Sequence, residues 1–306
     1  MKHYTVLKKE SIEALNIKSD GIYVDATLGY AGDASEILKR IKRGFLFAFD
    51  RDIDAIRYSE KVLSSISDRY KIIHSAFSSL SLKLQEEGIY KVDGILFDLG
   101  VSSPQLDENR GFSFMRDEVL DMRMNQDDKK TAQDVLNTYS FEELKTIFYS
   151  YGEEKKSSFI AKEIVLAREK KPITTTQELC SIILKAVGAK YFYKTHPERN
   201  IFQAIRIEVN NELKEIEKVL PEAISLLNPG GRLAVISFHS LEDRIVKRVF
   251  KKYSEVDRVV KGLPEIPEEY KPMVRLVNKK PIVPSKEELD ENSRSTSAKL
   301  RIVERL

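Results

Sequence analysis

The chain has 306 residues, one cysteine and no tryptophan, and its 51 Lys and Arg against 48 Asp and Glu leave a net charge of +3. The single cysteine, Cys180, excludes an intrachain disulfide framework and a zinc site made of several cysteines. No stretch approaches the roughly 20 apolar residues that span a bilayer, and the first residues lead into a charged amphipathic segment rather than an apolar signal region. We therefore expect a cytoplasmic protein without a membrane partner.

The positive charge is concentrated late in the chain. Residues 244–306 hold 16 Lys and Arg against 10 Asp and Glu, a net charge of +6. Such an asymmetry is compatible with a surface that faces RNA. A lysine-rich face that meets only solvent explains the same count equally well.

Strand and helix patterns alternate over the first hundred residues. Apolar runs predict strands at 21–26, 44–50, 70–74 and 92–98, with helices at 34–41 and 54–63. Continuous apolar strands separated by helices are typical of a parallel sheet covered on both faces. We predict an α/β fold with a doubly wound, mostly parallel sheet.

The alternation stops after the fourth strand. Helical patterns at 132–137, 141–149, 157–169 and 176–186 follow, with N-cap candidates at Thr174 to Thr176 for the last of them. A helix at 203–227, a turn at 228–231 and strands at 231–238, 273–277 and 298–303 complete the chain. We predict a catalytic domain of residues 1–104 and 202–306, split by a helical insertion of residues 105–201.

In an open parallel sheet, ligands bind beyond the carboxyl ends of the strands. Gly29 and Gly32 lie in the turn after the first strand, where missing side chains let a ligand approach the backbone. Asp50 ends the second strand, where a carboxylate can accept both hydroxyls of a ribose. Phe77 follows the third strand and can flank an adenine, and Asp98 ends the fourth. Two simpler roles stay open: Asp50 as a helix cap, and Phe77 as a core residue.

A glycine turn followed by an acid after the second strand is common to NAD enzymes and to S-adenosylmethionine enzymes. The strict G-x-G-x-x-G pattern is absent, because Tyr30 and Ala31 interrupt it. Since S-adenosylmethionine has no pyrophosphate to cradle, this absence favours a methyltransferase. A nicotinamide-dependent oxidoreductase stays open as the alternative.

Longer motifs carry a family resemblance. They are DLGVSSPQLD (98–107), RGFSF (110–114), LDMRM (120–124), YGEE (151–154), FQAIRIEVN (202–210), ISFHSLEDR (236–244) and SAKLR (297–301). In this order they closely resemble the bacterial 16S ribosomal RNA (cytosine-N4)-methyltransferase family, and the resemblance runs from His3 to Arg305.

The resemblance implies a Rossmann-like class I methyltransferase domain with an inserted all-helical domain for RNA recognition. It implies S-adenosylmethionine as cofactor and methylation of N4 of a cytidine in the decoding centre of the 16S rRNA, within the small ribosomal subunit. Mapped by motif, the cofactor contacts fall on seven residues: Ala31, Gly32, Asp33, Asp50, Phe77, Asp98 and Gln105.

The chain departs from the family at several positions. The usual Gly-Gly-His turn reads Ala31-Gly32-Asp33, and we expect Ala31 to be a small change provided that its φ is negative. Asp33 adds a carboxylate near a cationic ligand, and Thr5 replaces the usual proline. In residues 196–201, Arg199 stands one position earlier than the arginine of the family motif, which puts a role of Arg199 in RNA binding in doubt. The altered turn at 31–33 leaves a catalytically inactive RNA-binding module open as an alternative.

The amino group of cytosine is a poor nucleophile, because its lone pair is delocalised into the ring. We predict that Asp98, together with the hydroxyls of Ser102 and Ser103, accepts hydrogen bonds from this amine; the simpler role of Asp98 is to position the methionine ammonium. His239 could take a proton or contact the base, and its simpler role is structural.

Three arginines are candidates for RNA contacts: Arg110, Arg123 and Arg206. Their simpler role is to hold the insertion together, and Arg206 with Asn210 could likewise tie the two domains. The scattered histidines lack metal-ligand spacing, so we predict no metal site. The sequence leaves a monomer and a homodimer open.

Overall fold

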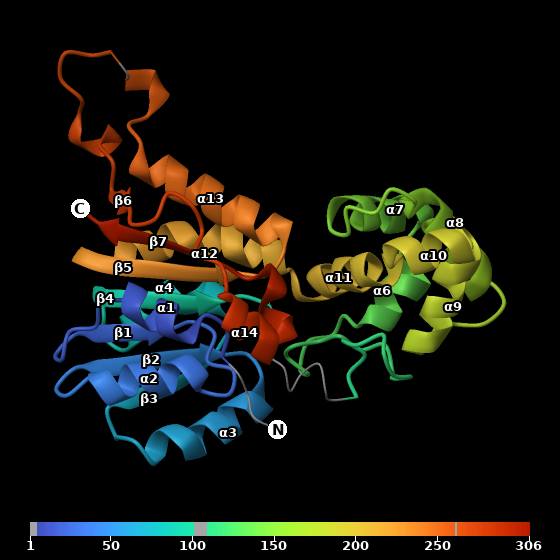
Figure 1. The fold of residues 1–306 in the computed structure, drawn as a ribbon, viewed down its shortest axis with the longest axis horizontal. Helices are drawn as coiled ribbons and strands as arrows, with labels where there is room; N and C mark the ends of the chain where they lie inside the picture. Colours follow the sequence, from blue (N-terminus) through green and yellow to red (C-terminus); the bar gives the residue numbers. More distant parts are fainter. Residues whose placement is uncertain (1–4, 101–108, 261) are drawn as a thin grey trace. The chain divides into compact units, whose positions relative to one another are not determined.

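The computed structural model describes residues 5–100, 109–260 and 262–306 (Figure 1). The chain divides into two compact units, one of residues 1–100 and 213–306 and the other of residues 101–212. Each unit has a hydrophobic core of its own. The predicted boundary at 201/202 falls inside a helix of the second unit, and the units separate after Glu212 instead.

A seven-stranded sheet forms the middle of the first unit, in the order β3-β2-β1-β4-β5-β7-β6. Five neighbouring strands are parallel, and β7 runs antiparallel between β5 and β6. The strand bounds are β1 Ile22–Asp25, β2 Phe45–Asp50, β3 Tyr70–His74, β4 Val92–Asp98, β5 Leu227–Ser237, β6 Val274–Leu276 and β7 Lys299–Arg305. The prediction of a doubly wound, mostly parallel sheet is confirmed.

Both faces of this sheet are covered, because alternate strand residues point to opposite sides. Val24, Ile95 and Val235 join the core on one face, and Tyr23 and Leu96 join the core on the other. Helices α4, α12 and α13 cover the first face, while α1, α2 and α3 cover the second (Figure 1). The bounds are α1 Lys8–Ala14, α2 Gly32–Arg40, α3 Ile53–Ser64, α4 Leu80–Glu86, α12 Glu212–Leu226, α13 Ser240–Ser254 and α14 Lys286–Glu291. Short 3-10 helices lie at Phe77–Ser79, Arg258–Val260, Glu268–Tyr270 and Ser293–Ser297.

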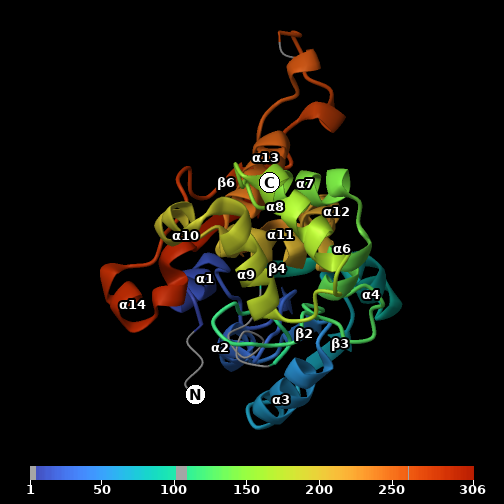
Figure 2. The same cartoon turned by 90° about the vertical axis from the view of Figure 1, so that its right-hand side faces the viewer.

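The second unit is helical over its described residues. Its helices are α6 Ala132–Thr138, α7 Phe141–Ser150, α8 Ser157–Arg168, α9 Thr176–Val187, α10 Ala189–Thr195 and α11 Pro197–Asn210. Helix α11 lies beside α6 and α7, and α8 lies between α7 and α9 (Figure 2). Thr131, Ser140 and Thr175 each begin a helix with a capping box, which satisfies two exposed backbone N–H groups at each start. The predicted N-cap of the helix after Thr175 is therefore confirmed.

Two predicted elements differ from the structure. The single helix predicted at 203–227 is wrong: α11 ends at Asn210, Asn211 has a φ of 52°, and α12 begins at Glu212. A residue in the left-handed region cannot continue a right-handed helix, and asparagine tolerates that region better than most residues. The predicted turn at 228–231 belongs to β5, whose pairing with β4 is irregular there because the register shifts between Val92 and Gly94. Helices α1, α4, α10, α13 and α14 were not predicted.

Over the described part of the chain, no helix combines the length and the apolar character needed to cross a membrane.

Candidate active site

The carboxyl ends of β1, β2, β4 and β5 meet at one edge of the sheet, as parallel pairing requires. Asp25 ends β1, Asp50 ends β2 and Asp98 ends β4, opposite Ile236 of β5. All three carboxylate groups are thus brought to one rim by the strand register. This is where ligands bind in open α/β sheets.

The turn after β1 is held by Asp50. Its Oδ2 accepts the backbone N–H of Gly29 at 2.7 Å, and its Oδ1 accepts that of Asp52 at 2.8 Å. Asp52, rather than Asp50, caps α3 through the N–H of Asp54. The cap interpretation of Asp50 is therefore wrong. Asp50 orders the turn, and a carboxylate that accepts two N–H groups still has lone pairs for further donors.

Ala31 has a φ of 61° and a ψ of 27°, so the condition of a negative φ is not met. Its Cβ makes this left-handed conformation cost about 1 kcal/mol more than it would for glycine. Ala31 links the turn to α2 in this conformation: its N–H donates to the Leu28 carbonyl at 2.9 Å, and its carbonyl accepts the N–H of Ser35 at 3.0 Å. At Gly32 a Cβ would lie 2.0 Å from Thr5 Oγ1, so the segment before α1 needs a glycine there.

Buried carboxyls crowd this rim. Desolvation raises the pKa of Asp25 to about 8, with further repulsion from Asp33. Desolvation raises the pKa of Asp33 to about 7. The pKa of Asp98 lies well above its ordinary value because of desolvation first and then repulsion from Asp33, Asp25 and Glu242. Burial likewise raises the pKa of Asp50.

Two of these carboxyls keep an oxygen without a partner. Asp25 Oδ1 accepts the N–H of Thr27 at 3.1 Å, while Asp25 Oδ2 has no hydrogen-bond partner among the described residues. The same holds, within those residues, for Asp98 Oδ1. A buried carboxylate oxygen that lacks a donor is costly, so both atoms indicate a site built to receive a cation or a donor.

Asp33 has a partner of its own, because Ser11 Oγ donates to Asp33 Oδ1 at 3.0 Å. Phe77 packs edge-on against Phe97, with ring centres 5.6 Å apart, and the guanidinium carbon of Arg51 lies 5.7 Å from the Phe77 ring centre. Phe77 is therefore in part a core residue, because its ring packs against Phe97.

His239 caps α13. Its Nδ1 accepts the N–H of Glu242 at 3.5 Å, and Glu242 Oε2 accepts the N–H groups of Phe238 at 2.7 Å and of His239 at 3.3 Å. His239 Nε2 lies 3.1 Å from Glu242 Oε1 without hydrogen-bond geometry. The structure therefore supports the structural role of His239, at a position next to the rim.

Comparison with protein families decides the identity of the chain. The sequence profile of the MraW methylase family matches residues 1–306. The chain belongs to the MraW methylase family. Solved structures similar to it include an rRNA methylase from Streptococcus thermophilus, with 13% identity over 98% of this chain and 93% of that chain and a TM-score of 0.42. Another is a Streptococcus mutans protein in complex with SAH, with 12% identity over 99% of both chains and a TM-score of 0.46.

The cofactor of this MraW-family chain is S-adenosylmethionine, which sets aside the nicotinamide alternative. The rim fits this ligand. Its sulfonium and ammonium groups are cationic, and the unpartnered oxygens of Asp25 and Asp98 are anionic when ionised. Bringing a cation beside such carboxyls lowers their pKa and offsets their cost of burial.

Three predicted site residues, Ser102, Ser103 and Gln105, lie outside the described residues. The arginines predicted to contact RNA all have intramolecular partners. Arg123 donates to both carboxylate oxygens of Asp121 and to two carbonyls of the same loop. Arg206 forms a bidentate pair with Glu212 at 2.8 and 2.9 Å.

Arg110, the third of these arginines, is buried and lies over the Phe112 ring at 5.8 Å. Asn210 binds the Met122 carbonyl and the Met124 N–H, both within the second unit. These contacts match the simpler, structural roles.

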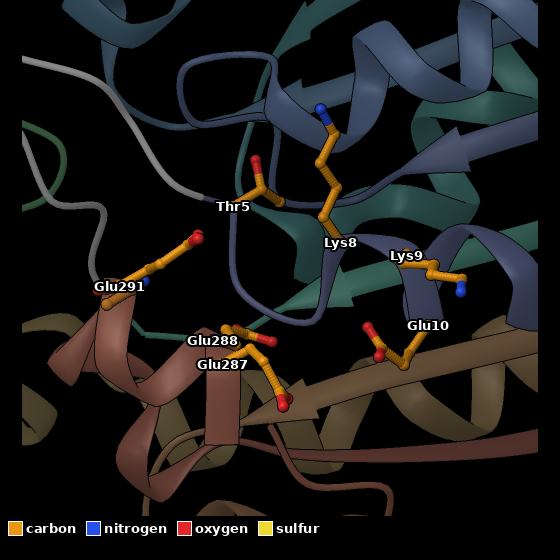
Figure 3. A pocket seen from close by; sticks show the side chains of 8 residues that line it. Thr5, Lys8, Lys9, Glu10, Glu287, Glu288 and Glu291 are labelled. Atoms are coloured by element: carbon orange, nitrogen blue, oxygen red, sulfur yellow. The ribbon is translucent and has the colours of Figure 1, made fainter. Parts of the chain in front are cut away.

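A cavity of about 380 Å³ lies between α14 and the segment from Thr5 to the first residues of α1. Figure 3 shows acidic side chains of α14 on one side and the side chains of Thr5 and α1 on the other. Its lining contains none of the predicted cofactor residues, so the buried carboxyls at the strand ends mark the cofactor site better than this cavity does.

Sequence reasoning did not select Asp25 or Glu242 for the site. Asp25 ends a predicted strand, as Asp50 and Asp98 do, so its position alone could have raised it as a candidate. Glu242 lies inside a quoted motif, but its burial against the rim depends on the packing of α13.

Proposed function

We propose that this methyltransferase transfers the methyl group of S-adenosylmethionine to N4 of a cytidine in the 16S rRNA, within the small ribosomal subunit. The resemblance implies nucleotide 1402. The observation that carries the chemistry is Asp98, a buried carboxyl at the end of β4 with an oxygen that lacks a partner among the described residues. The family membership and the motifs around Asp98 support the choice of substrate.

When bound, S-adenosylmethionine supplies an electrophilic methyl group and a positive charge. N4 must gain one carbon and lose one proton. Asp98 accepts an N–H of the amine, which holds N4 in place, and takes the proton that N4 loses; the cationic cofactor beside it favours the ionised form that this step needs. One of the hydroxyls of Ser102 and Ser103 accepts the second N–H of the amine in this proposal, and we assign His239, next to the neighbouring strand end, to a contact with the base.

The turn holds the cofactor through backbone groups of Gly29, Ala31 and Gly32, at the N-terminus of α2. Asp33 adds negative charge behind this turn. Asp50 accepts the ribose hydroxyls with its remaining lone pairs, and we assign Phe77 to the adenine and Gln105 to a polar contact. Asp25 joins this set through its unpartnered oxygen.

The unit of residues 101–212 recognises the RNA in this proposal. Arg110 contributes by shaping this unit from its buried position, and Arg123 and Arg206 contribute by shaping it and by presenting the edges of their partly exposed guanidinium groups. We assign them this role because planar guanidinium groups suit phosphates and exposed bases.

The test is incubation with labelled S-adenosylmethionine and unmethylated small ribosomal subunits. We expect label on N4 of one cytidine, and label on another base or atom would contradict the proposal. Failure of both labelling and cofactor binding would instead support an inactive RNA-binding module.

The variant that tests the catalytic role is Asp98→Asn, which keeps the shape of the side chain and removes the carboxylate that accepts the proton. We expect kcat to fall about 10²-fold or more, the contribution typical of a positioned acid or base. Calorimetry of cofactor binding separates this loss from a loss of affinity. An unchanged rate with unchanged binding would remove Asp98 from the chemistry.

A further inference from the structure

Helix α13 presents a surface that the site described above does not use. Its apolar side is buried, through Ile245, Val246, Val249 and Phe250. Between its fifth residue and Lys252, every exposed residue is a lysine or an arginine. These residues, here called the α13 cationic stripe, are Arg244, Lys247, Arg248, Lys251 and Lys252.

Helix stability does not account for the stripe. It places like charges three and four residues apart, as at Arg244 and Arg248, and each such pair costs about 0.2–0.5 kcal/mol. Only Lys251 and Lys252 lie in the last turn, where the helix dipole favours cations. The arrangement therefore opposes folding slightly, which points to a role outside the fold.

The ion pairs that stripe residues make with neighbouring acids do not cover the stripe. Arg248 pairs with Glu217 of α12 at 2.5 Å, yet its side chain stays 66% exposed. Lys251 lies 3.9 Å from Glu255, with both side chains 58% exposed. Exposed pairs of this kind contribute little and exchange readily for another anion. Asp243, at the start of the helix, is already paired with Arg301 at 2.6 Å.

The stripe begins next to the reaction rim. α13 starts at Ser240, three residues after β5 ends, and β5 ends beside Asp98 of β4. Arg244 is thus about one turn from the rim, and Lys252 lies about 12 Å further along the helix at 1.5 Å per residue. A single strand of RNA that followed the stripe would therefore have one end at the site of methyl transfer.

We propose that the α13 cationic stripe binds the sugar-phosphate backbone of the RNA substrate beside the target base; this rests on the proposed function. Five cations with no acid among them match a polyanion, and the flexible side chains suit phosphates rather than base edges. The stripe belongs to the catalytic unit and is separate from the arginines predicted for RNA binding, whose guanidinium groups are held inside the second unit.

The test compares two triple variants of the full chain. The stripe variant is Lys247→Gln, Arg248→Gln and Lys251→Gln. The matched control is Lys42→Gln, Arg57→Gln and Lys61→Gln, which removes three exposed cations, one just after α2 and two on α3, on the other face of the sheet. The measurement is the Kd for unmethylated 16S rRNA over a series of salt concentrations, with calorimetry of S-adenosylmethionine as the check on folding.

We expect the stripe variant to bind RNA at least tenfold more weakly near 0.1 M salt. The slope of log K against log salt should fall by about 2, since each lost phosphate contact removes about 0.7 for a single strand. The control should change the Kd less than twofold, and both variants should keep wild-type affinity for S-adenosylmethionine.

An equal loss in both variants would assign the effect to net charge and overturn the proposal, as would unchanged RNA binding. Loss of binding to anionic phospholipid vesicles, with RNA affinity retained, would overturn it in favour of a membrane surface. If the wild-type chain binds RNA through the stripe but methylates nothing, the proposed function fails and the stripe stands. If the stripe variant binds and methylates as the wild type does, the stripe fails and the function stands.

Discussion

At the scale of single residues, the buried carboxyls of the rim bind protons that the unfolded chain would release. Asp25 has a pKa of about 8 in the folded protein against an ordinary value of 3.8. Between these two values the folded state holds more protons than the unfolded state. The free energy of unfolding of the ligand-free protein therefore falls as the pH rises from about 4 to about 8, by up to about 1.4 kcal/mol per pH unit for one such carboxyl.

Asp25→Asn should remove this share of the pH dependence. The amide oxygen can still accept the N–H of Thr27, so the turn is kept. Urea unfolding at pH 5 and pH 8, without ligand, should show a smaller loss of stability in the variant than in the wild type, by about 1 kcal/mol or more. The same variant should bind S-adenosylmethionine more weakly at pH 8, because a buried anion is gone.

The control for this pH effect is Asp243→Asn. Arg301 and Lys299 hold the pKa of Asp243 below its ordinary value despite partial burial. Its stabilisation is therefore present above its unfolded pKa and is already complete at pH 5. Asp243→Asn should lower the stability at pH 5 and pH 8 by the same amount. Equal pH slopes in the wild type and in Asp25→Asn would refute the role of Asp25.

Two glycines of the first unit are required for different reasons, one because a side chain would clash there and the other because its backbone has a positive φ. A Cβ on Gly44 would lie 2.0 Å from the Gly21 carbonyl oxygen, where β2 begins beside β1, and no positive φ is involved. Gly88 has a φ of 75° and open space around it. Gly44→Ala should cost about 3 kcal/mol by overpacking against backbone, and Gly88→Ala about 1 kcal/mol. Thermal unfolding that ranks them in the reverse order would contradict this account.

At the scale of elements, Asn210 connects the end of α11 to the loop before α6. Its side chain accepts the N–H of Met124 at 2.9 Å and donates to the Met122 carbonyl at 2.8 Å, and it is buried. Met122 itself has a φ of 60°, so this loop is held in a conformation that its own residues do not favour. The amide of Asn210 holds both the loop and the last turn of the helix.

Asn210→Asp should destabilise the second unit by about 2–4 kcal/mol. The carboxylate has the same shape but cannot donate to the Met122 carbonyl, and its charge is buried. Because a protonated carboxyl can donate, stability should recover in part as the pH falls toward 4. Chemical denaturation followed by circular dichroism at pH 8 and pH 4.5 measures both effects, and Gln126→Glu, at an exposed position of the same loop, is the control.

Elements with continuous apolar runs could be predicted from the sequence. The bounds of β3 and β4 agree with the prediction to the residue. The β4 run is largely buried, whereas β3 has no fully buried residue and was recognised by its β-branched pair Ile72 and Ile73. The break at Asn211 could not be predicted, since a polar residue on the exposed side of an amphipathic helix gives the same pattern whether the helix continues or stops. Helix α13 could have been predicted, because Leu241, Ile245 and Val249 recur every four residues and form its buried side.

The candidate site was predictable where it follows from strand ends. Asp50 and Asp98 lie at the rim because a parallel sheet puts carboxyl ends together. The left-handed conformation of Ala31 and the missing partner of Asp25 Oδ2 could not be predicted. Both depend on how the segment before α1, the first turn of α2 and the neighbouring strands pack, which no local pattern encodes.

At the scale of the whole molecule, the chain leaves the sheet after β4 and returns to it only with β5. Between Asp98 and Leu227 it passes through the second unit and α12. Yet β4 and β5 are neighbours in the middle of the sheet and carry residues of both faces of its core.

This order has a consequence during synthesis. When a ribosome has released β4, one side of that strand has no neighbour, and its partner is still about 130 residues from being made. At about 5–20 residues per second, the exposed edge persists for roughly ten seconds. Edges of this kind pair readily with other chains. The nascent protein therefore passes through a period in which chaperone binding or crowding decides its yield, while the helical unit, built from local contacts, folds during the wait.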